Sequence, residues 1–313
     1  MSGTEERPAA RTTTAGAVTV RVPAKVNVQL AVGGARPDGF HDLANVFLAV
    51  SLYDEVTATP AAELTVTCEG PDADKVPLDR TNLAARAAEL LAARHGLSPD
   101  VHLHIAKDIP VAGGMAGGSA DGAGALLACD ALWGLNSSRA ELLDICAELG
   151  SDVPFSLVGG AALGVGRGER LTELPVSGAF HWVFAVADGG LSTPAVYGEF
   201  DRLNDGVDVP EPVASPALLE ALRTGDATAL AATLTNDLQP AAVSLRPSLS
   251  ATLEAGTAAG ALAALVSGSG PTTAFLVKDA EAAEAVAAAL TASGTCRTAR
   301  AATSPAPGAT VLP

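Results

Sequence analysis

The chain has 313 residues, 48% of them hydrophobic and 17% charged, with a formal net charge of −16 at pH 7. This length predicts one or two domains with a sizeable core. The acidic balance argues against nucleic acid or an anionic membrane as partner, because both attract basic surfaces. Four scattered cysteines and the absence of an apolar leader or membrane-spanning run predict a cytoplasmic protein without structural zinc.

The chain alternates between strand-like and helix-like patterns, which predicts a mixed α and β protein. Residues 1–17 and 303–313 are rich in Thr, Ala, Pro and Gly, and we expect both to be frayed tails. Between them we expect two domains, residues 18–168 and residues 169–302. The glycine-rich segment 159–169 is a candidate hinge.

The first ordered segment combines two alternating runs, residues 18–22 and 26–30, which predict strands on either side of a bend at 23–25. Lys25 and Asn27 lie two residues apart and would share one face of the second strand. Such a pair suits an anionic or hydroxylated ligand, although a solvated turn lysine is the simpler interpretation.

A turn follows at residues 36–41, whose Pro-Asp-Gly sequence is a strong turn signal. Phe40 and His41 come directly after it. Either the ring packs over its own loop, or the pair forms a platform for a planar ligand by stacking and hydrogen bonding.

Two or three more strands are predicted over residues 45–69, followed by a helix from Leu83 to about Arg94 that Asn82 would cap. Residues 101–105 alternate apolar and polar side chains, which indicates a half-buried strand. Lys107 follows that strand.

The segment from Ile109 to Asp121 is the strongest functional signal of the chain, because a glycine-rich loop separates the strand at 101–105 from a predicted helix at 120–133. The unpaired N–H groups of a first helical turn and the close approach that glycine allows make an anion cradle. A flexible turn is the alternative. Ser119 stands where a P-loop needs Lys, and a dinucleotide fingerprint lacks its first glycine, so neither common nucleotide motif fits.

Downstream, Ser138 begins a capping box for a helix that ends at Gly150. Asp152 follows in an apolar, structured setting. It is either a helix cap or a general base. Later segments predict a helix entered at residues 192–197 and a strand, glycine turn and strand over 264–277, which is either an ordinary hairpin or a second backbone cradle.

Three of these segments are similar, in the same order, to motifs of the GHMP kinases, the superfamily of galactokinase, homoserine kinase and mevalonate kinase. They are residues 23–27 (Pro-Ala-Lys-Val-Asn), the glycine loop 110–121 and residues 267–273 (Ser-Gly-Ser-Gly-Pro-Thr-Thr). Residues 36–41 and 149–155 further resemble signatures of the branch of this superfamily that acts on 4-diphosphocytidyl-2-C-methyl-D-erythritol (CDP-methylerythritol).

The resemblance implies an α+β fold of two domains, an N-terminal ATP-binding domain and a C-terminal ferredoxin-like domain, with the active site in the cleft. It implies ATP-dependent phosphorylation of the 2-hydroxyl of CDP-methylerythritol, with ADP as the second product, in the non-mevalonate isoprenoid pathway. The chain would be a monomer or a homodimer.

Residue roles follow from the same resemblance. Lys25 and Asp152 would be the catalytic pair, with Asp152 as the base. The cytosine would be sandwiched by Phe40 and Tyr197 and read by His41; Phe40 replaces the Tyr that is usual in the branch. The remaining acceptor contacts would be Asn27, Thr193, Gly268, Ser269 and Gly270. The ATP contacts would be Asn82, Lys107, Pro110, Val111, Ala112, Gly113, Gly114, Met115, Ala116, Gly117, Gly118, Ser119 and Ala120.

Mg²⁺ is expected as a cofactor with ATP, with Ser119 as a possible contact and no other ligand assignable. Ala112 and Ala116 replace glycines of some relatives, so we expect a negative φ at both positions or a slightly different loop. Two alternatives remain open: a GHMP kinase for homoserine, mevalonate or a sugar, and a non-catalytic ligand-binding protein of the same fold.

Overall fold

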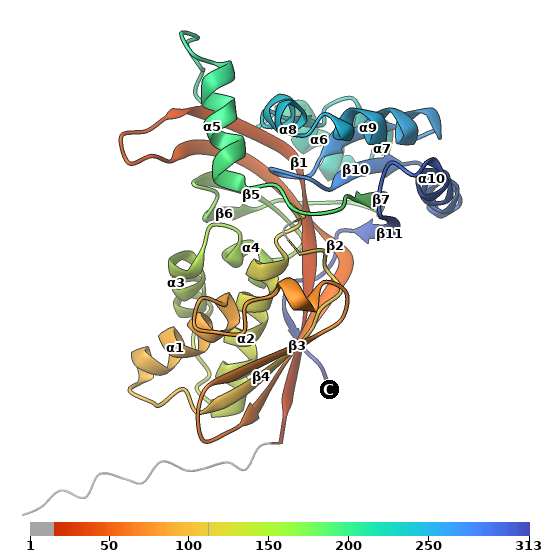
Figure 1. Cartoon of the computed structure of the whole chain (residues 1–313). Coiled ribbons are helices and arrows are strands. Elements are labelled where there is room, and N and C mark those ends of the chain that lie inside the picture. Colours follow the sequence, from red (N-terminus) through yellow and green to blue (C-terminus); the bar gives the residue numbers. More distant parts are fainter. Residues whose placement is uncertain (1–15, 112) are drawn as a thin grey trace, which may run out of the picture.

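The computed structural model describes residues 16–111 and 113–313. Two lobes share a pair of long antiparallel strands, β1 (Val18–Ala35) and β2 (His41–Pro60), which run from one lobe into the other (Figure 1). The tail predicted for residues 1–17 and the loop residue Ala112 fall almost entirely outside the described residues. Within those residues, none of the helices is long and apolar enough to cross a bilayer.

The larger sheet has eight strands and contains β1 and β2 at its centre. Helix α2 packs against both of these strands, and α1 packs against α2 (Figure 1). The other elements of this part are β3 (Thr65–Glu69), the 3-10 turn η1 (Ala73–Lys75), α1 (Leu83–His95), β4 (Val101–Ala106), α2 (Gly117–Trp133), α3 (Arg139–Leu149), α4 (Val153–Val158), β5 (Ala161–Gly166), β6 (Arg170–Glu173), β8 (Thr235–Asn236) and β12 (Thr310–Val311).

The smaller sheet has four antiparallel strands in the order β11-β7-β10-β9, and helices α9 and α10 pack on it. The α+β class predicted from the sequence is therefore confirmed. The elements of this part are β7 (Phe180–Val186), α5 (Thr193–Leu203), α6 (Pro216–Thr224), α7 (Ala227–Ala231), α8 (Gln239–Leu245), α9 (Ser248–Ala258), β9 (Ala263–Val266), β10 (Thr273–Val277), α10 (Ala280–Ser293) and β11 (Thr298–Ser304).

One hydrophobic core runs through both lobes. Trp182 and Phe184 of β7 and Leu218 of α6 belong to the same buried cluster as the inner residues of β1, β2 and α2. Burial of this shared apolar surface holds the two sheets together. The boundary between residues 168 and 169 stays a prediction.

The bend expected at residues 23–25 is instead a bulge within one continuous strand. The pairing of β1 with β2 shifts register between Pro23 and Ala24, and again between Asn27 and Gln29. Bulges of this kind re-aim side chains, and these two flank Lys25 and Asn27.

The prediction of a frayed tail at residues 303–313 is wrong. Strand β12 pairs with the start of β1, Ala306 is buried, and the Ala306 N–H donates to the carbonyl of Ala49 at 2.9 Å. Pro and Gly in this segment suggested disorder. Its backbone groups, however, form hydrogen bonds with residues far away in the sequence, and the local sequence does not reveal such bonds.

Candidate active site

The three motif segments meet at the carbonyl of Gly114. This oxygen accepts a hydrogen bond from Lys25 Nζ at 2.9 Å and one from Ser267 Oγ at 3.1 Å. The N–H of Thr272 donates to the neighbouring carbonyl of Gly113 at 3.3 Å. The glycine loop is thus fixed on one side by β1 and on the other by the turn between β9 and β10.

The Lys25 side chain is buried, with 4% of its surface exposed. Its ammonium donates to Asn27 Oδ1 at 2.7 Å, and the Asn27 amide in turn donates to Asn45 Oδ1 at 2.7 Å. An ammonium has three donors. Asn27 and Gly114 occupy two of them, so the third is available toward the cavity.

Asp152 supplies the nearest carboxylate to this ammonium, with 3.7 Å between Lys25 Nζ and Asp152 Oδ2. It stands at the N-cap position of α4 but makes no capping hydrogen bond, so the capping alternative is wrong. Burial lowers the pKa of Lys25, and the neighbouring Asp152 partly opposes that shift. An amine and a carboxylate from distant parts of the chain therefore meet at the glycine loop.

Helix α2 begins at Gly117, three residues earlier than predicted. Its N-cap residue is Ala116 with φ 60° and ψ 30°, so of the two alternatives expected there the negative φ is wrong and the slightly different loop remains. The first intrahelical hydrogen bond runs from Ala120 N–H to Ala116, so the amides before it are free of intrahelical partners. Ser119 lies inside this first turn.

Position 114 requires glycine for two reasons: its φ is 76°, and its surroundings leave no room for a side chain. A Cβ at this position would lie 2.1 Å from the carbonyl oxygen of Ser267. At Gly118 the same construction meets nothing within 4 Å, because this residue faces open space. One glycine therefore allows the loop to pack against the turn, and the other leaves the helix end accessible to a ligand.

The turn between β9 and β10 forms another part of the site, next to Lys25 and Asn27. Gly268 has φ 57°, and a Cβ there would lie 3.2 Å from both Lys25 Nζ and Asn27 Oδ1. Asn236 holds this turn by donating to the carbonyls of Val266 and Gly268 at 2.7 and 2.8 Å. The hydroxyls of Thr193 and Ser269 are hydrogen-bonded at 2.8 Å.

The far end of the site is aromatic. The His41 ring lies 4.9 Å from the Tyr197 ring, and its Nε2 contacts Asp201 Oδ1 at 2.7 Å. Phe40 is 49% exposed, and the Arg167 guanidinium lies over its ring at 5.2 Å. These side chains come from the β1–β2 turn, β2, α5 and the β5–β6 turn.

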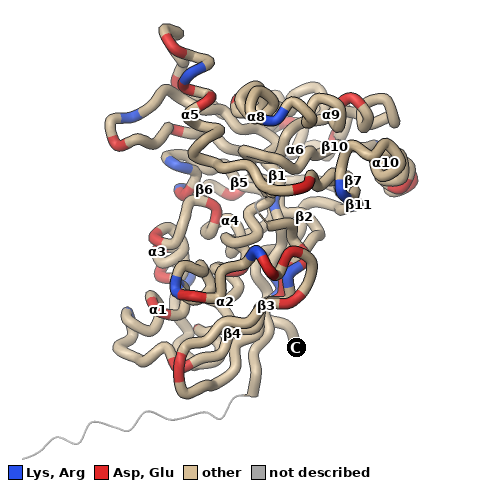
Figure 2. Tube along the Cα trace, in the orientation of Figure 1, with Lys and Arg blue, Asp and Glu red and all other residues tan. Residues whose placement is uncertain are grey.

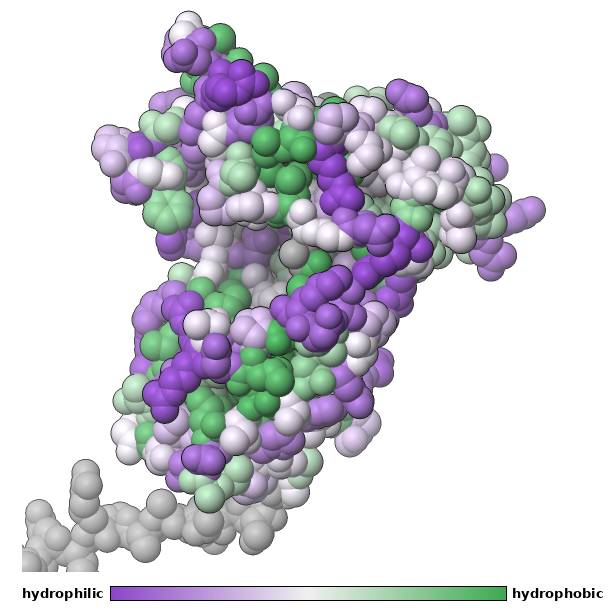
Figure 3. All heavy atoms as spheres, viewed as in Figure 1, coloured by the Kyte–Doolittle hydropathy of each residue, from purple (hydrophilic) through white to green (hydrophobic). Residues whose placement is uncertain are grey.

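Lys25, Asp152, the glycine loop, the turn at 268–270 and the aromatic end line one cavity of about 750 Å³. It lies between the two lobes, where the space-filling view shows a waist (Figure 3). The predicted site residues that line it are Lys25, Asn27, Phe40, His41, Gly113, Gly114, Ala116, Gly117, Gly118, Ser119, Asp152, Thr193, Tyr197, Gly268, Ser269 and Gly270.

Comparison with known proteins agrees with this geometry. Residues 82–160 match the family of GHMP kinases N terminal domains, and residues 218–296 match the GHMP kinases C terminal family. The 4-diphosphocytidyl-2-C-methyl-D-erythritol kinase of Streptomyces avermitilis is 85% identical over 94% of this chain and 99% of its own length. The enzyme of the same name from Thermobifida fusca is 60% identical over 94% and 98%.

The chain belongs to the 4-diphosphocytidyl-2-C-methyl-D-erythritol kinase family of the GHMP kinases. It is therefore an ATP-using small-molecule kinase. A crystal structure of 4-(cytidine 5'-diphospho)-2C-methyl-D-erythritol kinase matches with a TM-score of 0.74 and 33% identity over 91% of this chain and 98% of that one. A homoserine kinase from Cytophaga hutchinsonii has the same TM-score at 19% identity, which shows the shared fold alone.

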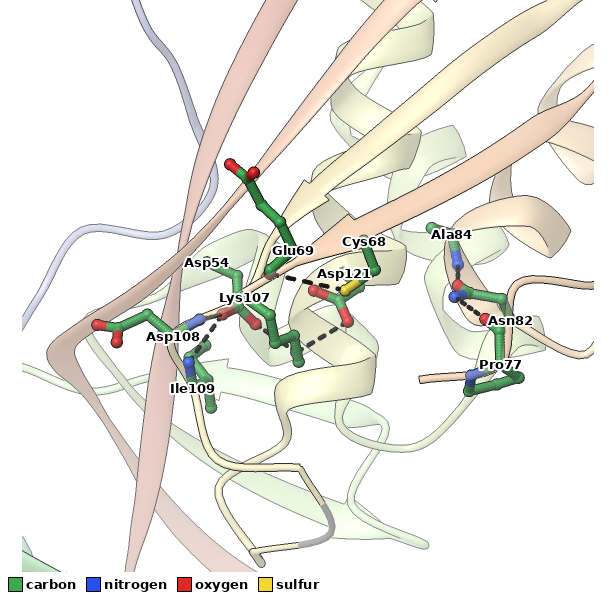
Figure 4. A network of polar contacts seen from close by, with 10 residues as sticks. All are labelled: Asp54, Cys68, Glu69, Pro77, Asn82, Ala84, Lys107, Asp108, Ile109 and Asp121. Carbon is green, nitrogen blue, oxygen red and sulfur yellow. Dashed lines mark hydrogen bonds and ion pairs between the residues drawn. The ribbon is translucent and has the colours of Figure 1, made fainter. Parts of the chain in front are cut away.

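Two predicted ATP contacts of this GHMP kinase lie outside the cavity lining. The Asn82 side chain accepts from Ala84 N–H at 2.8 Å and donates to Pro77 O at 2.7 Å, so it caps α1 (Figure 4). Lys107 is 3% exposed, and its ammonium binds Asp54 and Asp121 at 2.5 and 2.8 Å. Both side chains are bonded to protein groups away from the cavity lining, and their expected contacts with the nucleotide stay a prediction.

Asp54, Lys107 and Asp121 form a buried group directly beneath the start of α2 (Figure 4). A Cβ on Gly117 would lie 3.0 Å from Lys107 Nζ. Asp121 Oδ1 is buried without a hydrogen-bond partner. Burial raises the pKa of Asp121 to about 7, with Lys107 opposing that shift. Burial lowers the pKa of Lys107, but its two carboxylates outweigh this effect and the net shift is upward.

Several other predicted loop residues do not reach the cavity of this GHMP kinase. Pro110, Met115 and Ala120 are buried in the packing below the loop, and Val111 is half-buried outside the lining. Ala112 lies outside the described residues. The loop therefore presents its glycines, Ala116 and Ser119 to a ligand and uses its apolar side chains as an anchor.

Sequence reasoning missed four polar residues that line the cavity: Asn45, Ser151, Arg167 and Asp201. Asp201 follows Tyr197 by four residues, and this helical spacing would have placed both on one face of α5. Arg167 stands between two glycines of a segment that was interpreted as a hinge. Basic residues are few and scattered over both lobes (Figure 2), so the positive charge of this site comes from single residues.

Proposed function

We propose that this chain transfers the γ-phosphoryl group of ATP to the 2-hydroxyl of CDP-methylerythritol, giving the 2-phosphate and ADP. The observation that carries the proposal is the meeting of Lys25 and Asp152 beside the glycine loop. The names of relatives that are 85% and 60% identical supply the acceptor.

The ATP phosphates would lie against the first turn of α2. Free backbone amides and the helix dipole favour negative charge there. Gly118 offers no side chain to obstruct this approach. In a protein with net charge −16, such backbone groups provide positive potential without additional basic side chains.

Asp152 would act as the general base. Its carboxylate is 32% exposed at the cavity and makes no capping hydrogen bond, so it is available to accept the proton of an acceptor hydroxyl. Lys25 would stabilise the transferring phosphoryl group with its third donor. Phosphoryl transfer depends mostly on positioning and charge neutralisation, which this pair supplies.

The acceptor would extend from this pair to the aromatic end of the cavity. Asn27, Thr193 and Ser269 would contact its polyol and diphosphate, and Arg167 adds a cation near the same path. Phe40 and Tyr197 would hold the cytosine ring between them, with His41 at its edge.

Mg²⁺ would enter with ATP. This ion takes one or two protein oxygens and completes its coordination with phosphates and water. Among residues 16–111 and 113–313, no group of three His, Cys, Asp or Glu side chains could hold a metal ion. The Ser119 hydroxyl lines the cavity and would contact it, and the ion would neutralise phosphate charge.

The test is a kinase assay with purified protein, ATP and Mg²⁺ against CDP-methylerythritol, homoserine and mevalonate. We expect CDP-methylerythritol to be phosphorylated with kcat/KM at least about 100-fold above the other two. Phosphorus NMR should show one new phosphomonoester together with ADP.

The Asp152→Asn variant assigns the activity to this site. Loss of the base should lower kcat by about 100-fold to 10,000-fold, while KM for ATP stays nearly unchanged. Preference for homoserine or mevalonate would refute the proposed acceptor. Normal turnover of Asp152→Asn would refute the role of the carboxylate.

A further inference from the structure

Asn45 lies between the two ends of the cavity. On β2, His41, Leu43 and Asn45 follow one another at intervals of two residues, and all three line the cavity, as expected for one face of a strand. Further along β2, Ala49 lies opposite Lys25 of β1. Along the strand, Asn45 therefore stands between His41 and the neighbourhood of Lys25.

The ammonium of Lys25 fixes the orientation of two side-chain amides. An ammonium only donates, so the Asn27 atom that it contacts at 2.7 Å must be the carbonyl oxygen Oδ1. The amide nitrogen of Asn27 then faces Asn45 and donates to Asn45 Oδ1 at 2.7 Å. The remaining atom of the Asn45 amide, Nδ2, is consequently a donor group whose direction is set by this relay.

This donor group of Asn45 is free to meet a ligand. The residue is buried, with 4% of its surface exposed, and among residues 16–111 and 113–313 its Nδ2 makes no hydrogen bond. Nδ2 is absent from the fully buried polar atoms that lack a partner, so it reaches the surface of the cavity that Asn45 lines. A donor held in one direction at a cavity surface suits an oxygen atom of a bound molecule.

The acceptor molecule is asymmetric in a way that matches this position. Its 2-hydroxyl reacts, its oxygen at carbon 4 carries the diphosphate, and its 3-hydroxyl lies between them. Because the cytosine would lie beside His41, a side chain between His41 and Lys25 meets either the 3-hydroxyl or the diphosphate. Asn45 is neutral, and the amide of Asn27 is the one group between it and the Lys25 ammonium. Both facts favour the hydroxyl next to the reacting one.

We propose that Asn45 is a further acceptor-binding residue, which donates from Nδ2 to the 3-hydroxyl of CDP-methylerythritol and thereby orients the neighbouring 2-hydroxyl toward Asp152. The inference rests on the proposed function, and it adds the contact that fixes the polyol. A hydrogen bond at this point restricts rotation of the polyol next to the reacting carbon.

Steady-state kinetics with CDP-methylerythritol give the first measurement. Asn45→Ala should lower kcat/KM for this acceptor by about 10-fold to 100-fold and leave KM for ATP unchanged. Asn204→Ala is the matched control, because the Asn204 amide donates to the carbonyl of Phe200 at 2.8 Å and Asn204 does not line the cavity. An unchanged kcat/KM in Asn45→Ala would overturn the inference.

The Asn45→Asp variant separates a contact with the acceptor from mere support of Asn27. A carboxylate still accepts the hydrogen bond from Asn27, but it has no N–H group to donate. We expect the loss of kcat/KM to be at least as large as in Asn45→Ala. Normal kcat/KM in Asn45→Asp would show that Asn45 only supports its neighbour, and the inference would be wrong.

Two shortened ligands locate the contact. CDP contains the base and the diphosphate but no polyol, and its Kd, measured by calorimetry, should be equal in the unmodified protein and in Asn45→Ala. On the 3-deoxy analogue of CDP-methylerythritol, the same two proteins should have kcat/KM values within about twofold of each other.

Weaker binding of CDP to Asn45→Ala would assign the contact to the diphosphate or the base and overturn the inference. So would a loss of kcat/KM in Asn45→Ala that is equally large on the 3-deoxy analogue. Failure of the unmodified protein to phosphorylate CDP-methylerythritol would instead refute the proposed function, so the two failures are distinguishable.

Discussion

At the scale of single residues, the site depends on charged groups removed from water. The buried ammonium of Lys25 donates hydrogen bonds to Asn27 and to the Gly114 carbonyl. These bonds offset the cost of removing the charge from water and fix its position. The buried ammonium of Lys107 is instead paired with two carboxylates. One buried lysine faces the cavity, and the other supports the loop from below.

The group beneath the loop contains two carboxylates and one ammonium, and it makes stability depend on pH. The pKa of Asp121 is raised in the folded protein to about 7 from an ordinary value of 3.8. The folded state then binds the proton more tightly than the unfolded chain. The stabilisation of the folded state by this tighter proton binding is complete below pH 4 and is lost as pH rises toward 7.

We therefore predict that Asp121→Asn removes this dependence. The free energy of unfolding of the unmodified protein should fall relative to the variant by on the order of 1 kcal/mol per pH unit between pH 5 and pH 7. Urea unfolding at several pH values measures it. Parallel pH profiles for the two proteins would show that Asp121 titrates normally.

At the scale of elements, the glycine loop works because its neighbours leave no room for a side chain. The Gly114 carbonyl binds β1 and the β9–β10 turn together, and the loop then enters α2 through the left-handed Ala116. A left-handed alanine costs about 1 kcal/mol, which the surrounding hydrogen bonds offset.

Gly114→Ala should therefore destabilise the junction by about 3 kcal/mol or more and raise KM for ATP, because its Cβ would collide with the Ser267 carbonyl. Gly134→Ala is the control. Gly134 has a similar φ of 64° but nothing within 4 Å of an added Cβ, so only the left-handed strain of about 1 kcal/mol applies. Thermal unfolding and ATP kinetics compare the two variants, and equal losses would refute the collision.

At the scale of the whole molecule, the end of the chain returns to its beginning. Residues 305–313 lie against the strand pair that carries Lys25. The Ala306 N–H donates to Ala49, the residue opposite Lys25 in β2, and Leu312 N–H donates to Thr19 at 2.8 Å. This segment supports the strand that carries Lys25 from outside the cavity.

Deletion of residues 305–313 should consequently lower Tm by on the order of 5 °C, corresponding to about 2 kcal/mol, and reduce kcat. Deletion of Pro313 alone is the control, since it leaves β12 intact. Calorimetry and the kinase assay measure both effects. A full-length Tm in the longer deletion would show that the segment is dispensable.

The sequence by itself determined the local features of this protein: the strand at 101–105, the capped helices after Asn82 and Ser138, the glycine loop, and the motifs that indicate a GHMP kinase. These features depend on neighbours in the chain, through propensity, capping and turn chemistry. Only the tertiary structure decided whether a polar side chain faces the cavity or is enclosed in the protein interior. Lys25 and Lys107 look alike in sequence, yet one meets Asp152 at the cavity and the other is enclosed by Asp54 and Asp121. Contacts between residues far apart in the chain make that difference, and no local pattern records them.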